Sequence, residues 1–145
     1  MSVAHYTLSR AGVAGALIAA TLALAGCATS HSGNCAAGFD AFERDTLYFG
    51  RAIPTGGQVS DADWADFLDT RVTPAFPQGF TVIDAAGQWR AASGQVVREP
   101  SKLVVLLHPR DAKADAAIAT LIDTYRQRFA QEAVLQERQS VCARF

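Results

Sequence analysis

Residues 102–108, Lys-Leu-Val-Val-Leu-Leu-His, form the most apolar stretch of the chain after its N-terminal segment. Their length and composition predict a buried central strand. Pro109 ends it, because proline has no N–H for the ladder. A hairpin is expected just before this strand, since residues 88–90 and 95–98 flank the turn sequence Ala-Ala-Ser-Gly. Pro100 then predicts a bulge or the start of the strand.

Three further segments predict strands. Residues 46–51 (Thr-Leu-Tyr-Phe-Gly-Arg) and residues 80–84 are rich in side chains that favour β-structure. Residues 133–137 indicate a last strand, with Cys142 just beyond it.

Two helices are predicted by capping residues and apolar spacing. The first covers residues 61–71, with Ser60 as its N-cap. Pro74 and Pro77 are expected to stop it. Asp111 caps the second helix, whose apolar residues recur at helical spacing as one continuous stripe. The stripe consists of Ile118, Leu121, Ile122, Tyr125 and Phe129.

The order of the predicted elements is βαββαβ, with one hairpin in the middle. The ferredoxin-like α+β sandwich has this order, and in it a four-stranded antiparallel sheet carries two helices on one face. Right-handed crossovers place the first and third strands together at the centre of the sheet. We therefore expect residues 39–145 to form a single α+β domain with this topology.

The N-terminal segment carries the clearest targeting signal. Residues 1–26 contain a short polar region that ends at Arg10, followed by an apolar run of about 15 residues, too short to span a bilayer as a helix. The run leads into Leu24-Ala25-Gly26-Cys27, which resembles the bacterial lipobox. This resemblance implies that residues 1–26 are a lipoprotein signal peptide. It also implies cleavage before Cys27, a diacylglyceryl group on the Cys27 thiol and fatty acylation of the new amine, for example with palmitate.

The lipid predicts where the protein resides. Two or three acyl chains hold a protein stably at a membrane, whereas one chain binds only marginally. Residues 27–38 are then the lipidated cysteine and a flexible linker of small polar residues. Residue 28 is Ala rather than Asp, which by analogy with Gram-negative sorting favours the outer membrane, facing the periplasm.

Two cysteines, Cys35 and Cys142, remain after Cys27. An even pair in an exported chain predicts a disulfide, here one that joins the start of the domain to its last strand. One alternative is a redox role for the pair. The other is a metal site formed with His31, but such a site would lack a fourth ligand and any CxxC spacing. We predict a disulfide, and no metal or other cofactor.

Several short motifs occur together along the domain. They are Leu47-Tyr48-Phe49-Gly50, Val72-Thr73-Pro74 with Phe76-Pro77 and Gly79, Gly87-Gln88-Trp89-Arg90, Arg98-Glu99-Pro100-Ser101-Lys102, and Glu132-Ala133-Val134-Leu135. As a set, from about Leu47 to the C-terminus, they resemble an uncharacterised bacterial family of small exported proteins, a domain of unknown function. The resemblance implies an envelope location and a compact α+β domain, and it brings no activity, substrate or catalytic residue.

Basic and aromatic side chains gather around the predicted hairpin. With a turn at residues 91–94, Trp89 and Arg98 are diagonal neighbours on one face, close enough for the guanidinium to lie over the indole. Such a group could bind a small anionic ligand: a carboxylate, a phosphate or a lipid headgroup. The alternative is a surface ion-pair network of Arg90, Arg98 and Glu99 that holds the hairpin. The other candidates for the ligand site are Tyr48, Arg51, Arg90, Lys102 and His108.

Catalytic residues are not assigned. His108, the only histidine of the predicted domain, could act as an acid or base with Tyr48 or Glu99. A histidine at a strand end more often bonds a loop carbonyl, and no Ser/His/Asp set accompanies it. A solvated helix face, rather than a calcium loop, is expected for the aspartates of the first helix. These are Asp61, Asp63, Asp66 and Asp69.

Net charge and motifs together limit the classes of function that this chain can have. With 13 basic and 14 acidic residues the formal net charge is −1, which gives no electrostatic case for nucleic acid. The leading hypothesis is a non-enzymatic envelope lipoprotein that binds a small ligand or an envelope protein through its open sheet face or hairpin. The alternatives are a small enzyme that uses the same face and a purely structural envelope component. Fold-level analogy adds a homodimer through the sheet face.

Overall fold

The computed structural model describes residues 35–145. In chain order the elements are β1 (Asp40–Gly50), α1 (Asp61–Phe67), the π-helical segment η1 (Leu68–Val72), α2 (Thr73–Ala75), β2 (Thr81–Arg90), β3 (Val96–His108), α3 (Ala112–Arg128) and β4 (Leu135–Ala143). No helix within this range is long and apolar enough to cross a membrane. The predicted signal peptide, Cys27 and His31 lie outside the described residues.

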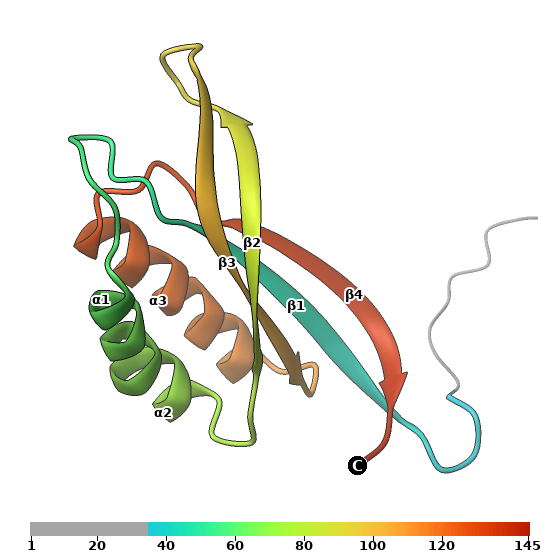
Figure 1. Cartoon of the computed structure of the whole chain (residues 1–145). Helices are drawn as coiled ribbons and strands as arrows, with labels where there is room; N and C mark the ends of the chain where they lie inside the picture. Colours follow the sequence, from blue (N-terminus) through green and yellow to red (C-terminus); the bar gives the residue numbers. More distant parts are fainter. Residues whose placement is uncertain (1–34) are drawn as a thin grey trace, which may run out of the picture. The chain divides into compact units, whose positions relative to one another are not determined.

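One sheet contains all four strands in the order β2-β3-β1-β4, and every neighbouring pair is antiparallel. The helices pack on one face of this sheet (Figure 1). The expected ferredoxin-like α+β sandwich is confirmed, with β1 and β3 at its centre.

The strands run further than the sequence pattern predicted. β1 begins at Asp40, β2 continues without a break through Arg90, and β4 extends past Cys142. β3 also passes through Pro100 with no bulge. The Pro100 carbonyl accepts the Arg51 N–H at 3.1 Å. Because the N and C=O of a strand residue point to the same side, the proline nitrogen also points toward β1, but beyond Gly50, the last residue of that strand. No ladder bond is therefore lost at the proline.

The first helix continues beyond its predicted end. α1 begins as expected, since the Ser60 hydroxyl accepts the Asp63 N–H at 3.0 Å. The helix then widens in η1, where the Thr73 N–H bonds the carbonyl of Leu68, five residues earlier. This wider turn accommodates Pro74, which a regular α-helix would exclude, and the helical path ends at Ala75.

Aromatic side chains fill the space between the sheet and the helices. Phe49 of β1 lies 4.6 Å from the Tyr125 ring of α3 and 5.5 Å from the Trp64 ring of α1, measured between ring centroids. Leu47 and Leu106 complete the buried face of the two central strands. The even-numbered residues of β1 and the odd-numbered residues of β3 consequently point to the opposite, open face.

A disulfide joins Cys35 to Cys142, as the cysteine count predicted. It ties the chain just before β1 to the edge strand β4. Because both thiols are used, a metal site that needs them as ligands is excluded. Elsewhere in residues 35–145, no group of three or more His, Cys, Asp or Glu side chains is placed to hold a metal ion.

Candidate functional site

The register of the β2–β3 hairpin separates two residues that were predicted to touch. Trp89 lies opposite Val97, and Arg98 lies opposite Gln88. The predicted pairing was wrong by one residue, because the connection spans five residues rather than four and closes through the Ala91 N–H and the carbonyl of Gln95. A slip of one residue moves a side chain to the other face, so Trp89 and Arg98 lie on opposite faces of the sheet.

The basic candidates do not form one cluster. The Arg51 guanidinium is buried, where it donates to the carbonyl of Val59 and lies 2.8 Å from Asp61. Two other basic side chains also have local partners. Lys102 bonds Asp84 on the helix-bearing face, and Arg90 donates to the carbonyl of Gly94.

The aspartates of α1 and η1 follow the same pattern. Asp61 pairs with Arg51, and Asp63 and Asp66 lie within ion-pair distance of Arg128. Asp69 is exposed. These contacts agree with a solvated helix face rather than a calcium loop.

His108 belongs to a buried ionic network. The residue is 3% exposed; Nδ1 lies 2.8 Å from the carbonyl oxygen of Pro109, and Nε2 lies 2.7 Å from Asp45 Oδ2. The bond to a loop carbonyl agrees with the structural interpretation of this histidine. Asp45 is fully buried and also accepts from Gln136 and Arg138.

The electrostatics of Asp45 follow from its neighbours. Burial by itself raises the pKa of this carboxyl, but hydrogen bonds from Arg138, Gln136 and His108 outweigh it and hold the pKa below its ordinary value. The hydrogen bond to Asp45 in turn raises the pKa of Arg138. Asp45 and Arg138 therefore stay ionised at neutral pH, and the contacts of Asp45 join β1, β3 and β4 on the helix-bearing face.

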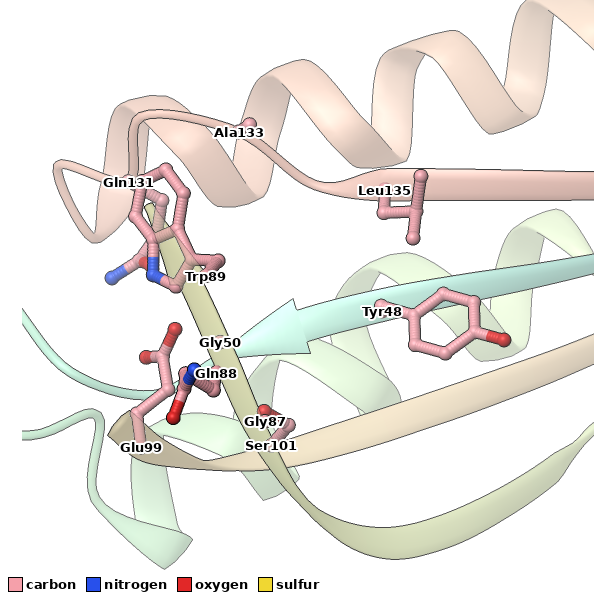
Figure 2. A pocket seen from close by; sticks show the side chains of 10 residues that line it. All are labelled: Tyr48, Gly50, Gly87, Gln88, Trp89, Glu99, Ser101, Gln131, Ala133 and Leu135. Carbon is pink, nitrogen blue, oxygen red and sulfur yellow. The ribbon is translucent and has the colours of Figure 1, made fainter. Parts of the chain in front are cut away.

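The open face contains a hollow of about 200 Å³ where the hairpin passes the end of β1 (Figure 2). Gly50 and Gly87 make room for it. A Cβ at Gly50 would lie 2.7 Å from the carboxyl carbon of Glu99, and a Cβ at Gly87 would lie 2.9 Å from Ser101 Oγ. Neither glycine has an unusual φ, so an alanine at either position would act through space, by displacing the facing Glu99 or Ser101 side chain.

Glu99 and Trp89 are the chemically distinctive groups of the hollow. The Glu99 Oε2 atom accepts the Ala52 N–H at 2.7 Å, which holds the carboxylate over Gly50. Figure 2 shows the Trp89 indole beside this carboxylate. From the core side, the Tyr125 hydroxyl donates to the carbonyl of Gly50 at 2.9 Å and fixes the floor of the hollow.

The other walls are apolar or neutral. Tyr48 and Leu135 come from neighbouring strands, and the Tyr48 hydroxyl donates to Glu137 at 2.9 Å. This bond raises the pKa of the Tyr48 phenol. Among the residues that line the hollow, none is a lysine or arginine. The carboxylate of Glu99 is thus the one charged group in its lining.

Four of the five sequence motifs converge on this hollow, although their roles were not predicted. Residues 47–50, 87–90, 98–102 and 132–135 all contribute to its lining. The alternation of side chains along a strand could have predicted that Gly87 and Trp89 lie on the same face. That Glu99 lies on this face as well follows only from the register of the hairpin.

The fold and the hollow together define a small ferredoxin-like α+β domain with a ligand-sized depression on its open face. The chain belongs to the family described as "Protein of unknown function (DUF3574)", whose model matches residues 44–145. No curated protein matches the chain.

Two solved structures share this fold. One is described as a phage SAM lyase in complex with S-methyl-5'-thioadenosine; it has a TM-score of 0.58 and 16% identity, over 79% of this chain and 95% of that one. The other is described as a phage SAM lyase in the apo state, with a TM-score of 0.55 and 16% identity, over 72% and 90% of the two chains. At this identity the likeness shows the fold alone.

Proposed function

We propose that this protein is a lipid-anchored binding module of the bacterial envelope, and that the open-face hollow binds a small organic cation with an apolar part. The lipobox-like segment that ends at Cys27 supports the anchor, with the domain facing the periplasm from the outer membrane. The hollow, beside the family's motifs, supports the binding role.

The observation that carries the choice of ligand is the Glu99 carboxylate held over Gly50 beside the Trp89 indole. A carboxylate attracts a cation, and the face of an indole adds a cation–π attraction. An anion would meet Glu99 without a lysine or arginine in the lining to offset the repulsion. Geometry therefore favours a cation over the anionic ligand expected from the sequence.

A charge series of similar shape tests this proposal. Benzylammonium, benzyl alcohol and benzoate are titrated into the purified full-length protein by calorimetry. We expect benzylammonium to bind most tightly, and Glu99→Gln to weaken it at least about tenfold, since a charge-assisted bond contributes about 1.5–3 kcal/mol. Asp69→Asn, which removes the same charge from an exposed site, should leave the affinity unchanged. Benzoate binding as tightly as benzylammonium would refute the proposal.

A second candidate is a small enzyme that works in the same hollow. Both similar structures are described as SAM lyases, which favours this candidate at the level of the fold. Here Glu99 would serve as the acid or base. Incubation with SAM, followed by mass spectrometry for S-methyl-5'-thioadenosine, tests it. Product that disappears in Glu99→Gln supports an enzyme, and equal yields from both proteins exclude a role for this hollow.

The anchor has its own test. Cys27→Ala removes the atom that would carry the diacylglyceryl group, so we expect the variant to leave the membrane fraction or to remain unprocessed. Unchanged membrane partitioning and unchanged mass would refute lipid attachment at this position.

A further inference from the structure

A second hollow of about 280 Å³ adjoins the first at the tip of the β2–β3 hairpin. The two hollows share Trp89, Glu99 and Gln131 in their linings. The second is completed by the segment after β1, the hairpin tip and the loop after α3, which contributes Glu132. Trp89, Glu99 and Gln131 therefore lie at the boundary between the two hollows.

Gln131 is one of the polar side chains at this boundary. Gln131 is 8% exposed, and its Nε2 donates to the carbonyls of Ala52 (2.8 Å) and Phe129 (3.2 Å). No donor within residues 35–145 contacts its side-chain oxygen. Every fully buried side-chain N or O in that range has a partner, so this oxygen retains some exposure. Gln131 lines both hollows, and its side-chain oxygen is available there as an acceptor.

Glu132 gives the second hollow its own negative charge. Its Oε2 accepts the Ala92 N–H at 3.0 Å, which holds the carboxylate against the hairpin tip. Neither lining contains a lysine or arginine. The nearby Arg126 donates to the main-chain oxygen of Glu132 and lies 3.5 Å from Asp123.

We propose that the ligand is a linear aliphatic diamine, with one ammonium group on Glu99 in the first hollow and the other on Glu132 in the second. This inference rests on the proposed function of the hollow. Two carboxylates in adjoining hollows that share the Trp89 indole match two positive charges joined by an apolar chain, whereas a single cation leaves one carboxylate without a cationic partner. The Gln131 oxygen accepts an ammonium N–H along the way.

Calorimetric titrations of the full-length protein test the proposal. The probes are n-butylammonium and the α,ω-diamines from 1,3-diaminopropane to 1,6-diaminohexane. We expect one diamine length to bind at least about tenfold more tightly than n-butylammonium, as one added charge-assisted contact implies. Glu132→Gln should lower the diamine to the affinity of the monoamine and leave the monoamine unchanged, which also shows that the variant is folded. Glu99→Gln should weaken both, and Asp69→Asn neither.

The outcomes separate this inference from the function on which it rests. If benzylammonium and n-butylammonium bind through Glu99 but no diamine is preferred, or if Glu132→Gln leaves the preference intact, the diamine is excluded and the cation site stands. If no ammonium probe binds the wild-type protein, both proposals fall.

Discussion

The buried network around Asp45 offers the sharpest test of how this fold is held together. Replacing Asp45 by asparagine keeps the size of the side chain but removes its charge and turns one acceptor into a donor. Oδ1 accepts from Gln136 at 2.6 Å, and Oδ2 accepts from His108 at 2.7 Å and lies 2.9 Å from Arg138 Nη2. Whichever way the amide turns, its NH2 group faces a donor.

The size of the effect follows from burial. Removing one partner of a buried ion pair costs about 3–5 kcal/mol. Asp45 is fully buried, but the Arg138 side chain is 35% exposed and can be partly rehydrated. We therefore expect Asp45→Asn to lower the free energy of unfolding by about 3 kcal/mol, toward the lower end of that range, and the Tm by about 10 °C.

Urea denaturation followed by circular dichroism measures this change. The matched control is Asp84→Asn, the same substitution in an ion pair with Lys102 on the same sheet face. Because Asp84 is 81% exposed, its loss should cost less than about 1 kcal/mol. A cost below about 1 kcal/mol for Asp45→Asn, similar to that of the control, would contradict the reasoning.

The same pair of proteins has a defined pH dependence. The folded pKa of Asp45 lies below its ordinary value of 3.8, so its contribution to stability is present above that value and is lost as the pH falls through the folded pKa. The stability difference between wild type and Asp45→Asn should therefore shrink as the pH is lowered below 3.8. A difference that stays constant into strong acid would show that the charge is not what matters.

Two further predictions concern the crosslink and the hollow. Reduction of the Cys35–Cys142 disulfide, or its removal by two serine substitutions, should lower the free energy of unfolding by about 4–5 kcal/mol. The reason is that the disulfide closes a loop with a sequence separation of 107. Equal urea midpoints with and without reductant would contradict this. Gly50→Ala should displace the Glu99 carboxylate and reduce the affinity for benzylammonium to that of Glu99→Gln. The lost hydrogen bond from Ala52 should cost at most about 1.5–3 kcal/mol of stability. Full affinity in the alanine variant would show that the carboxylate does not need its position over residue 50.

The candidate site could be predicted only in part. Trp89 and Tyr48 were predicted as ligand-site residues and do line the hollow. Glu99, expected in a surface ion-pair network, lines it as well, whereas Arg98 lies on the opposite face. The difference comes from one residue in the length of the hairpin connection, which reverses the face of every side chain on one strand relative to the other. A tight turn of four residues and a looser one of five are both compatible with Ala-Ala-Ser-Gly-Gln.

The amino-acid sequence by itself determined the βαββαβ order, the helix caps at Ser60 and Asp111, and the pairing of Cys35 with Cys142. These features depend on local periodicity, on capping chemistry and on an even number of cysteines, all of which can be read along the chain. Only the tertiary structure decided which charges are buried and which side chains meet. Asp45 finds Arg138 at a sequence separation of 93, and Glu99 lies over Gly50 only after the hairpin has crossed the end of β1. Such contacts depend on register between distant strands, which no local pattern encodes.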